Sequence, residues 1–130
     1  MEAILELSFA AVPTAATHAR TEMTERFGSR LAGRVLEDVR LLVTELITNA
    51  LRHGSLRKGD RVSLKAWLTE DILHIEVRDP GRDGDVARRP PGERGGGYGL
   101  YLVEKLAKRW GVDRRDGTLV WCEVPSGAER

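Results

Sequence analysis

Hydrophobic and polar side chains alternate along two neighbouring segments in the middle of the chain. In residues 61–68 the apolar side chains occupy the even positions, and in residues 72–79 they occupy the odd positions. A period of two is typical of strands with one buried face, and Glu70 and Asp71 between the segments suit a turn. The pattern therefore predicts a hairpin in which Asp79 lies on the covered face of its strand.

A second pattern, with the period of an α-helix, covers residues 34–53. Apolar side chains recur there three and four positions apart, as in a helix with one buried stripe. The stripe consists of Val35, Val39, Leu42, Val43, Leu46 and Ala50. Gly54 follows as a natural helix end. An earlier helix is predicted from Pro13 and Thr14 to about Phe27, because proline and threonine suit a helix start.

The remaining segments complete the series of strands and helices. They are a strand over 2–9, a loop over Pro80–Gly97, a helix from Tyr98 to about Arg109, and strands near 110–115 and 118–124 joined by the Asp116–Gly117 turn. This order predicts an α/β fold, a two-layer sandwich with a mixed, mostly antiparallel sheet and helices on one face. The other sheet face would be open to solvent or to a partner.

Composition narrows the class of protein. The 130 residues fit one domain, and the net charge of +1 does not predict direct binding of nucleic acid. Apolar runs such as Ala10–Val12 are far too short to span a bilayer, and the first residues do not resemble a secretory signal. We therefore expect a cytoplasmic protein without membrane contact. The single cysteine, Cys122, is expected to be a small core or surface residue.

Two polar residues of the predicted helix 34–53 stand beside its apolar stripe. In projection Asn49 falls next to the stripe and Glu45 on its edge, one helical turn apart. A structural network could satisfy two such groups, since buried polar groups require partners. Alternatively, they point into a pocket, where an amide oxygen and a carboxylate suit a Mg²⁺–phosphate site and the activation of a nucleophile.

Two further features suggest a ligand. Asp79 is followed by Pro80 and Gly81, which is a turn sequence, but a carboxylate there could also accept a hydrogen bond from the exocyclic amine of adenine. Gly81 would let a flat ring approach the backbone. The run Gly95–Gly99 precedes a predicted helix, where amide groups could bind an anion or could simply form a hinge. The run has neither the dinucleotide fingerprint nor a P-loop sequence.

Taken in order, these motifs resemble the Bergerat-fold ATPase superfamily, which includes gyrase-type, chaperone and histidine-kinase ATPases. The motifs are Glu45-Leu-Ile-Thr-Asn49, then Asp79-Pro-Gly81, then Gly97-Tyr-Gly99-Leu100. The resemblance covers nearly the whole chain. The small size, the stretch Gly99-Leu-Tyr-Leu-Val and the ending Gly117-Thr118-Leu-Val-Trp are similar to the stand-alone anti-sigma-factor serine/threonine kinases of bacteria.

The resemblance implies roles for individual residues and for cofactors, ATP and Mg²⁺. It makes Asn49 the ligand of Mg²⁺, Glu45 the catalytic group that activates the attacking hydroxyl, and Asp79 the partner of the adenine amine. The other implied nucleotide contacts are Gly81 near the base, Thr118 near the base, Arg94 in a mobile lid over about 80–97, and Gly97, Gly99 and Leu100 along the phosphates. The roles of Arg52 and His53 stay open.

The resemblance also implies a function and partners. It predicts a kinase that phosphorylates an anti-sigma-factor antagonist, regulates a sigma factor and forms a homodimer. The alternative is a nucleotide-gated binding module without catalysis. A detached histidine-kinase domain is disfavoured, because that family usually carries an amide at the position of Glu45. Trp67, on the polar face of its strand, either marks an interface or is an isolated surface residue.

Overall fold

The computed structural model describes residues 3–53, 56–81 and 100–127. Within these residues, strands and helices follow one another in the predicted order. They are β1 (Ala3–Ala10), α1 (Ala15–Phe27), the 3-10 helix η1 (Gly28–Arg30), α2 (Gly33–His53), β2 (Arg61–Thr69), β3 (Ile72–Asp79), α3 (Tyr101–Leu106), β4 (Arg109–Asp113) and β5 (Thr118–Pro125).

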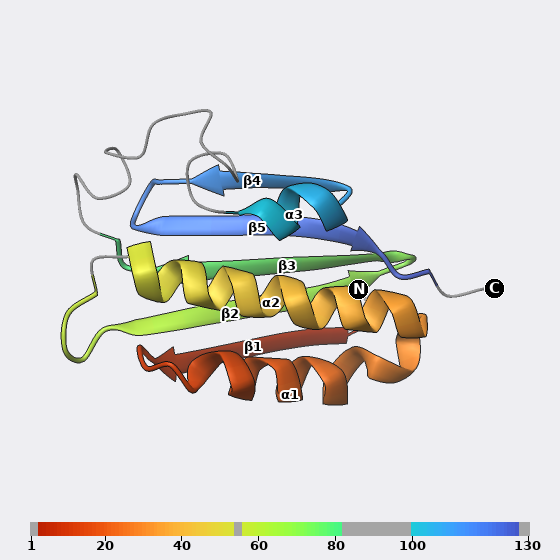
Figure 1. Ribbon diagram of the computed structural model, residues 1–130, viewed down its shortest axis with the longest axis horizontal. Helices are drawn as coiled ribbons and strands as arrows, with labels where there is room; N and C mark the ends of the chain where they lie inside the picture. The colour runs from red at the N-terminus through yellow and green to blue at the C-terminus, as the bar shows by residue number, and fades with distance from the viewer. Residues whose placement is uncertain (1–2, 54–55, 82–99, 128–130) are drawn as a thin grey trace.

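The strands form one sheet in the order β1-β2-β3-β5-β4. Each of the four neighbouring pairs is antiparallel. Among the described strands the sheet is therefore antiparallel throughout, and the expectation of a mixed sheet was wrong. Figure 1 shows α1, α2 and α3 over the same face of this sheet. The two-layer α/β sandwich predicted from the sequence is therefore confirmed.

The two predicted hairpins are present. Along β2 and β3 every second residue is buried, and Asp79 is buried with the apolar residues of β3. Glu70 in the connection has a positive φ of 52°. Between β4 and β5, Asp116 and Gly117 have φ of 56° and 89°, as expected where an Asp-Gly pair closes a tight hairpin. The alternating pattern and the turn residues thus determine both hairpins.

The helix expected from Tyr98 to about Arg109 is shorter than predicted. The structure starts α3 at Tyr101 and ends it at Leu106, whereas Tyr98 and Gly99 lie outside the described residues. The chain turns extended at Ala107, whose ψ is 146°. The amide of Lys108 donates to the carbonyl of Glu123 at 2.8 Å. Pairing with β5 thus replaces the last helical turn, and Arg109 belongs to β4.

The central helix α2 buries more of its surface than one stripe. All six residues of the predicted stripe are buried, and so is Ile47, which the stripe omitted. The reason is the position of α2, which contacts α1 on one side, α3 on the other, and strands β2, β3 and β5 beneath it. A helix enclosed on three sides buries an arc wider than a single stripe. This packing fixes how α2 is rotated and therefore where Glu45 and Asn49 point.

The uncovered sheet face carries an aromatic stack. The ring of Trp67 lies 4.1 Å from that of His74, and the ring of Trp121 lies 5.7 Å from His74 on a neighbouring strand, both nearly parallel to the imidazole. The His74 nitrogens lie 3.1 Å from Glu123 Oε2 and 3.0 Å from Glu76 Oε2. Trp67 is therefore not an isolated surface tryptophan, because a cross-strand neighbour covers one of its faces.

Gly117 offers a test of how tightly the β4–β5 turn is held against β3. A Cβ atom at Gly117 would lie 2.3 Å from the carbonyl oxygen of Asp79, and φ is 89°. Gly59 has the same kind of backbone, with φ of 90°, but nothing lies within 4 Å of its Cβ position. We expect Gly59→Ala to lower the free energy of unfolding by about 1–2 kcal/mol, the cost of a left-handed backbone. Gly117→Ala should lower it by clearly more, because steric overlap is added.

Urea unfolding followed by circular dichroism measures both variants, with Gly33→Ala as the matched control. Gly33 begins α2, has open space around its Cβ position and shows no positive φ. Its replacement should leave the free energy of unfolding unchanged or raise it. Equal losses for the Gly59 and Gly117 variants would contradict the close contact of the turn with β3.

Candidate functional site

Three elements bring the predicted site residues to one end of the molecule. In Figure 1 the last turns of α2, the end of β3 and the beginning of β5 lie together at the left-hand end. The contacts of α2 with β3 and β5 agree with this view. Glu45 and Asn49 lie on α2, Asp79 ends β3, and Thr118 begins β5. Residues far apart in the sequence therefore converge because α2 packs over β3 and β5 at this end.

Asp79, Gly81 and Thr118 form the first half of the candidate site. Asp79 pairs directly with Thr118 across the β3–β5 ladder, and both are about 95% buried. A Cβ atom at Gly81 would lie 2.9 Å from Thr118 Oγ1 and 3.0 Å from Asp79 Oδ1. A side chain at this position would overlap both groups, so only a glycine fits there. The three residues predicted to surround a base thus lie in close contact at one place.

Asn49 and Glu45 form the second half. Asn49 is 7% exposed, and its Oδ1 atom is buried without a hydrogen-bond partner among the described residues. A buried carbonyl oxygen without a partner is unfavourable by about 1–3 kcal/mol. An apolar residue at this position would avoid that cost. The arrangement is the one expected if Oδ1 accepts its partner from a ligand or a metal ion.

Glu45 is engaged in a different way. Its carboxylate accepts hydrogen bonds from two backbone amides at the start of α3, from Val103 N to Oε1 at 3.0 Å and from Leu102 N to Oε2 at 3.2 Å. A carboxylate at a helix N-terminus is stabilised by the free amides and the helix dipole. In this state Glu45 therefore belongs to a structural network, which was one of the two interpretations that the sequence left open.

No sequence pattern marks the amides of Leu102 and Val103 as part of the site. The helix was expected to begin at Tyr98, and the amides of residues 102 and 103 would then have bonded within that helix. Because α3 begins at Tyr101, they are the second and third residues of its first turn and have no partner inside the helix. The backbone amides of Leu102 and Val103 can be recognised as free donors only when it is known that α3 begins at Tyr101.

A hollow of about 260 Å³ runs along α2 at this place. It is lined by Leu41, Thr44, Glu45, Thr48, Asn49, Arg52 and Leu102. Thr44, beside Glu45, accepts a hydrogen bond from Arg20 Nη1 of α1 at 2.7 Å. This bond helps to hold that part of α2 against α1. The hollow places both Glu45 and Asn49 on one wall, as the pocket interpretation required.

Some predicted site residues cannot be located. Arg94, Gly97 and Gly99, together with the predicted lid over residues 82–97, lie outside the described residues. Leu100 is described and fully buried just before α3, so its side chain anchors the helix start. Arg52 is exposed at the rim of the hollow.

The donor atoms fit the groups that the resemblance implies. Magnesium prefers oxygen ligands and takes only one or two from protein beside phosphates and water. The unpartnered Asn49 Oδ1 supplies one such oxygen. In the part of the chain that the structure describes, no three His, Cys, Asp or Glu residues cluster into a metal site.

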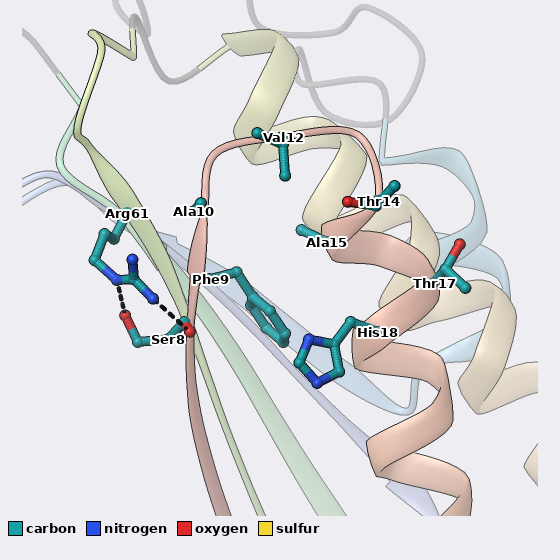
Figure 2. A pocket seen from close by; sticks show the side chains of 9 residues that line it. All are labelled: Ser8, Phe9, Ala10, Val12, Thr14, Ala15, Thr17, His18 and Arg61. Carbon is teal, nitrogen blue, oxygen red and sulfur yellow. Dashed lines mark hydrogen bonds between the residues drawn. The ribbon is translucent and has the colours of Figure 1, made fainter.

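A larger hollow lies elsewhere, between the end of β1 and the start of α1. It measures about 520 Å³, and Figure 2 shows the side chains around it. Arg61 is already bonded to Ser8, with Nε 2.7 Å from Oγ and Nη2 2.9 Å from the carbonyl oxygen. The rings of Phe9 and His18 meet edge to face at 5.2 Å. None of the predicted site residues lines it, so we place the candidate site at the smaller hollow.

Cys122 is a core residue, and the sequence predicted a small core or surface residue. It is fully buried in β5, and burial raises the pKa of its thiol to about 12, with the charges of Glu123 and Glu45 adding to the effect. The thiol therefore stays protonated at neutral pH and is no nucleophile.

None of the helices in the described ranges is long and apolar enough to cross a membrane.

Known proteins are similar to this chain in sequence. Serine-protein kinase RsbW of Listeria monocytogenes is 32% identical over 84 residues, which are 55% of this chain and 54% of that protein. Serine-protein kinase RsbW of Bacillus subtilis is 31% identical over 98 residues, 65% of this chain and 61% of that protein. The aligned regions thus span between half and two thirds of these relatives.

A solved structure and a family model also match this chain. A blue-light activated histidine kinase of Erythrobacter litoralis has a TM-score of 0.59 and 30% identity, over 74% of this chain and 32% of the kinase. Residues 7–123 of this chain match the model of the histidine kinase-like ATPase domain. This range includes both halves of the candidate site. The chain therefore belongs to the histidine kinase-like ATPase domain family.

Proposed function

We propose that the protein binds ATP together with Mg²⁺ at the site formed by α2, β3 and β5. The observation that supports this most strongly is Asn49 Oδ1, a buried acceptor without a partner, on the wall of a hollow that also holds Glu45. Asn49 would be the protein ligand of Mg²⁺. Asp79 would accept the exocyclic amine of adenine, with Gly81 and Thr118 beside the base.

The phosphates complete the proposed site. By the family resemblance, Gly97, Gly99 and Leu100 would line them and Arg94 would lie near them. Bound ATP and Mg²⁺ supply a transferable phosphoryl group whose negative charge the metal neutralises. The part of this chain is to orient the nucleotide and to hold the metal through one amide oxygen.

Nucleotide binding is measured by calorimetry at fixed Mg²⁺ concentration. Asp79→Asn should weaken ATP binding about tenfold or more, because an amide replaces a charged acceptor facing the base. Asn49→Leu should remove the Mg²⁺-dependent part of the affinity while the protein stays folded, since Oδ1 has no hydrogen-bond partner to lose among the described residues. Glu37→Gln, on the exposed surface of α2, is the control and should bind as wild type does. Absence of binding by wild type at millimolar ATP would refute the proposal.

We further propose that the protein is a kinase for serine or threonine. In that reaction the substrate hydroxyl oxygen forms a bond to the γ-phosphorus, the bond to the β–γ bridging oxygen breaks, and ADP leaves. Glu45 would accept the hydroxyl proton. Two relatives are named serine-protein kinases, and Glu45 is the carboxylate one turn from Asn49 on the same wall.

A specific observation favours the second candidate function, a nucleotide-gated binding module without catalysis. Each oxygen of Glu45 accepts a hydrogen bond from a backbone amide, that of Leu102 or of Val103. A residue needed only to hold α3 would look the same. The choice between the two functions therefore depends on what Glu45 does when nucleotide is bound.

The substitution Glu45→Gln separates the two functions. Glutamine keeps the size and one acceptor oxygen for α3 but cannot take a proton, a change worth about 10²–10⁴ in rate. We expect the variant to bind ATP and to fail to transfer radiolabelled phosphate to an antagonist protein. Equal labelling by both proteins would exclude Glu45 as the base. Normal ATP binding without any labelling by wild type would favour the binding module.

The proposed partners follow from the kinase assignment. The phosphate acceptor would be an anti-sigma-factor antagonist, and the second partner would be a sigma factor that the protein regulates, in the cytoplasm. The names of the relatives and the family resemblance support this proposal.

We also propose a homodimer formed through the uncovered sheet face. The outer edge of β1 is a poor surface for strand pairing, because its carbonyls are already used. Arg26 donates to the carbonyl of Ile4, Arg61 to that of Ser8, and the amide of Val12 to that of Ala10. Protected edges disfavour pairing with a second sheet. The open face, with two tryptophans stacked on His74, is a larger surface of the sheet than this edge.

Light scattering over a wide concentration range tests the dimer. Ser63 is exposed on the open face and Val12 is exposed away from it. Ser63→Arg should shift the protein towards monomer, because it places a long charged side chain in the interface, whereas Val12→Arg should not. A wild-type protein that stays monomeric at every concentration would exclude the homodimer.

A further inference from the structure

The turn between β4 and β5 rests on the end of β3. A Cβ atom at Gly117 would overlap the carbonyl oxygen of Asp79 and would lie 3.0 Å from that of Pro80. The next residue along the chain, Thr118, pairs with Asp79 as the last residue pair of the β3–β5 ladder. The backbone of the turn therefore lies against one side of the place where Asp79 and Thr118 meet.

This last pair is the part of the ladder that opens most easily. The ends of secondary-structure elements open at a lower free energy than their middles, because fewer contacts hold them. Opening of this pair would separate Thr118 from Asp79 and from Gly81, whose Cβ position lies 2.9 Å from Thr118 Oγ1. A contact that holds the turn on β3 therefore also maintains the geometry of this half of the candidate site.

Arg78 makes such a contact. Its Nη1 atom donates to the carbonyl oxygen of Asp116 at 2.9 Å and lies 3.4 Å from the carbonyl oxygen of Arg115. Successive side chains of a strand point to opposite faces. Asp79 is therefore buried on the covered face, whereas its neighbour Arg78 is exposed on the open face. The guanidinium group can thus bond the turn from outside without entering the site.

A second arginine of the same turn makes a different set of bonds. Arg115 donates to the carboxylate of Asp113 three times, from its backbone amide at 2.9 Å, from Nε at 3.1 Å and from Nη2 at 2.8 Å. These bonds stay within the connection between β4 and β5. Arg115 therefore stiffens the turn itself, whereas Arg78 joins the turn to β3. The two residues allow the effects of these contacts to be measured separately.

We propose that Arg78 is a positioning residue for the half of the site that surrounds the base. It holds the β4–β5 turn on β3 and so keeps Thr118 and Gly81 at Asp79 in the arrangement that selects adenine. This inference rests on the proposed binding of ATP. It gives Arg78 no contact with the nucleotide, because the side chain lies on the opposite face of the sheet from Asp79.

The ratio of the dissociation constants of GTP and ATP, measured by calorimetry at fixed Mg²⁺ concentration, tests this role. ATP presents an exocyclic amine to Asp79, whereas GTP presents a carbonyl oxygen, so wild type should prefer ATP. Changes that weaken both nucleotides equally, through the phosphates or through the oligomeric state, cancel in the ratio. A residue that only stabilises the fold would leave the ratio unchanged.

Arg78→Met should lower this ratio about three- to tenfold, the effect expected for the loss of charge-assisted hydrogen bonds at an exposed position. Arg78→Lys should keep the ratio within about twofold of wild type, because an ammonium group can donate to the same carbonyls. Arg115→Met is the matched control, since it removes an exposed guanidinium group from the same turn, and it should change the ratio by no more than about twofold. Circular dichroism checks that each variant is folded, and Arg78→Thr replaces Arg78→Met if that variant is not.

The possible failures can be told apart. An unchanged ratio in Arg78→Met would overturn the inference and leave ATP binding intact. An equal loss in Arg115→Met would overturn it as well, because the stiffness of the turn rather than its link to β3 would then matter. A loss that Arg78→Lys does not reduce would exclude the bonds to the carbonyls as the cause. If wild type binds neither nucleotide, or both equally, the proposed base site is refuted, and the inference fails with it.

Discussion

The rotation of α2 about its own axis is the constraint on which the site depends. The helix is enclosed by α1, α3 and the sheet, and each contact buries apolar side chains such as Val39, Leu42 and Ile47. A rotation by one residue, about 100°, would expose several of them at about 1.5–3 kcal/mol each. The packing of their neighbours therefore holds Glu45 and Asn49 at the hollow, and for Glu45 the bonds from Leu102 and Val103 add to it.

The β3–β5 ladder imposes the matching constraint on the other half. Register in a sheet is set by the alternation of buried and exposed side chains, because a slip of one residue would turn every side chain over. The buried residues of both strands keep Asp79 opposite Thr118. The Asp116–Gly117 turn then brings its backbone against Asp79. Two independent packing requirements thus meet at one end of the sandwich.

Much of this could be predicted from the sequence because it depends on periodicity. The alternation in β2 and β3 placed Asp79 on the covered face, and the helical period placed Asn49 beside the buried stripe of α2. Such patterns reflect burial, which dominates the free energy of folding. The fold class follows from the order of the strands and helices, whereas Gly81 and Thr118 were expected beside Asp79 because of the family resemblance.

The contacts that periodicity does not encode could not be predicted. Glu45 bonds backbone amides, which every residue carries, so no sequence pattern marks Leu102 or Val103 as its partners. Their availability depends on where α3 begins, and helix ends are poorly determined by composition. Ile47 was omitted for a related reason: a single helical stripe does not show that α2 has neighbours on three sides. The pairing of His74 with two glutamates likewise depends on strand order.

The raised pKa of Cys122 has a consequence for spectroscopy. The thiol is the only one in the chain, it is fully buried, and it stays protonated at neutral pH. Maleimide and iodoacetamide reagents attack accessible thiolates, so the folded protein behaves towards them as if it had no cysteine. A single cysteine introduced at an exposed position such as Lys105 would carry a fluorophore or spin label selectively. A probe on α3 can thus report on the surroundings of this helix in a chain that keeps its native core.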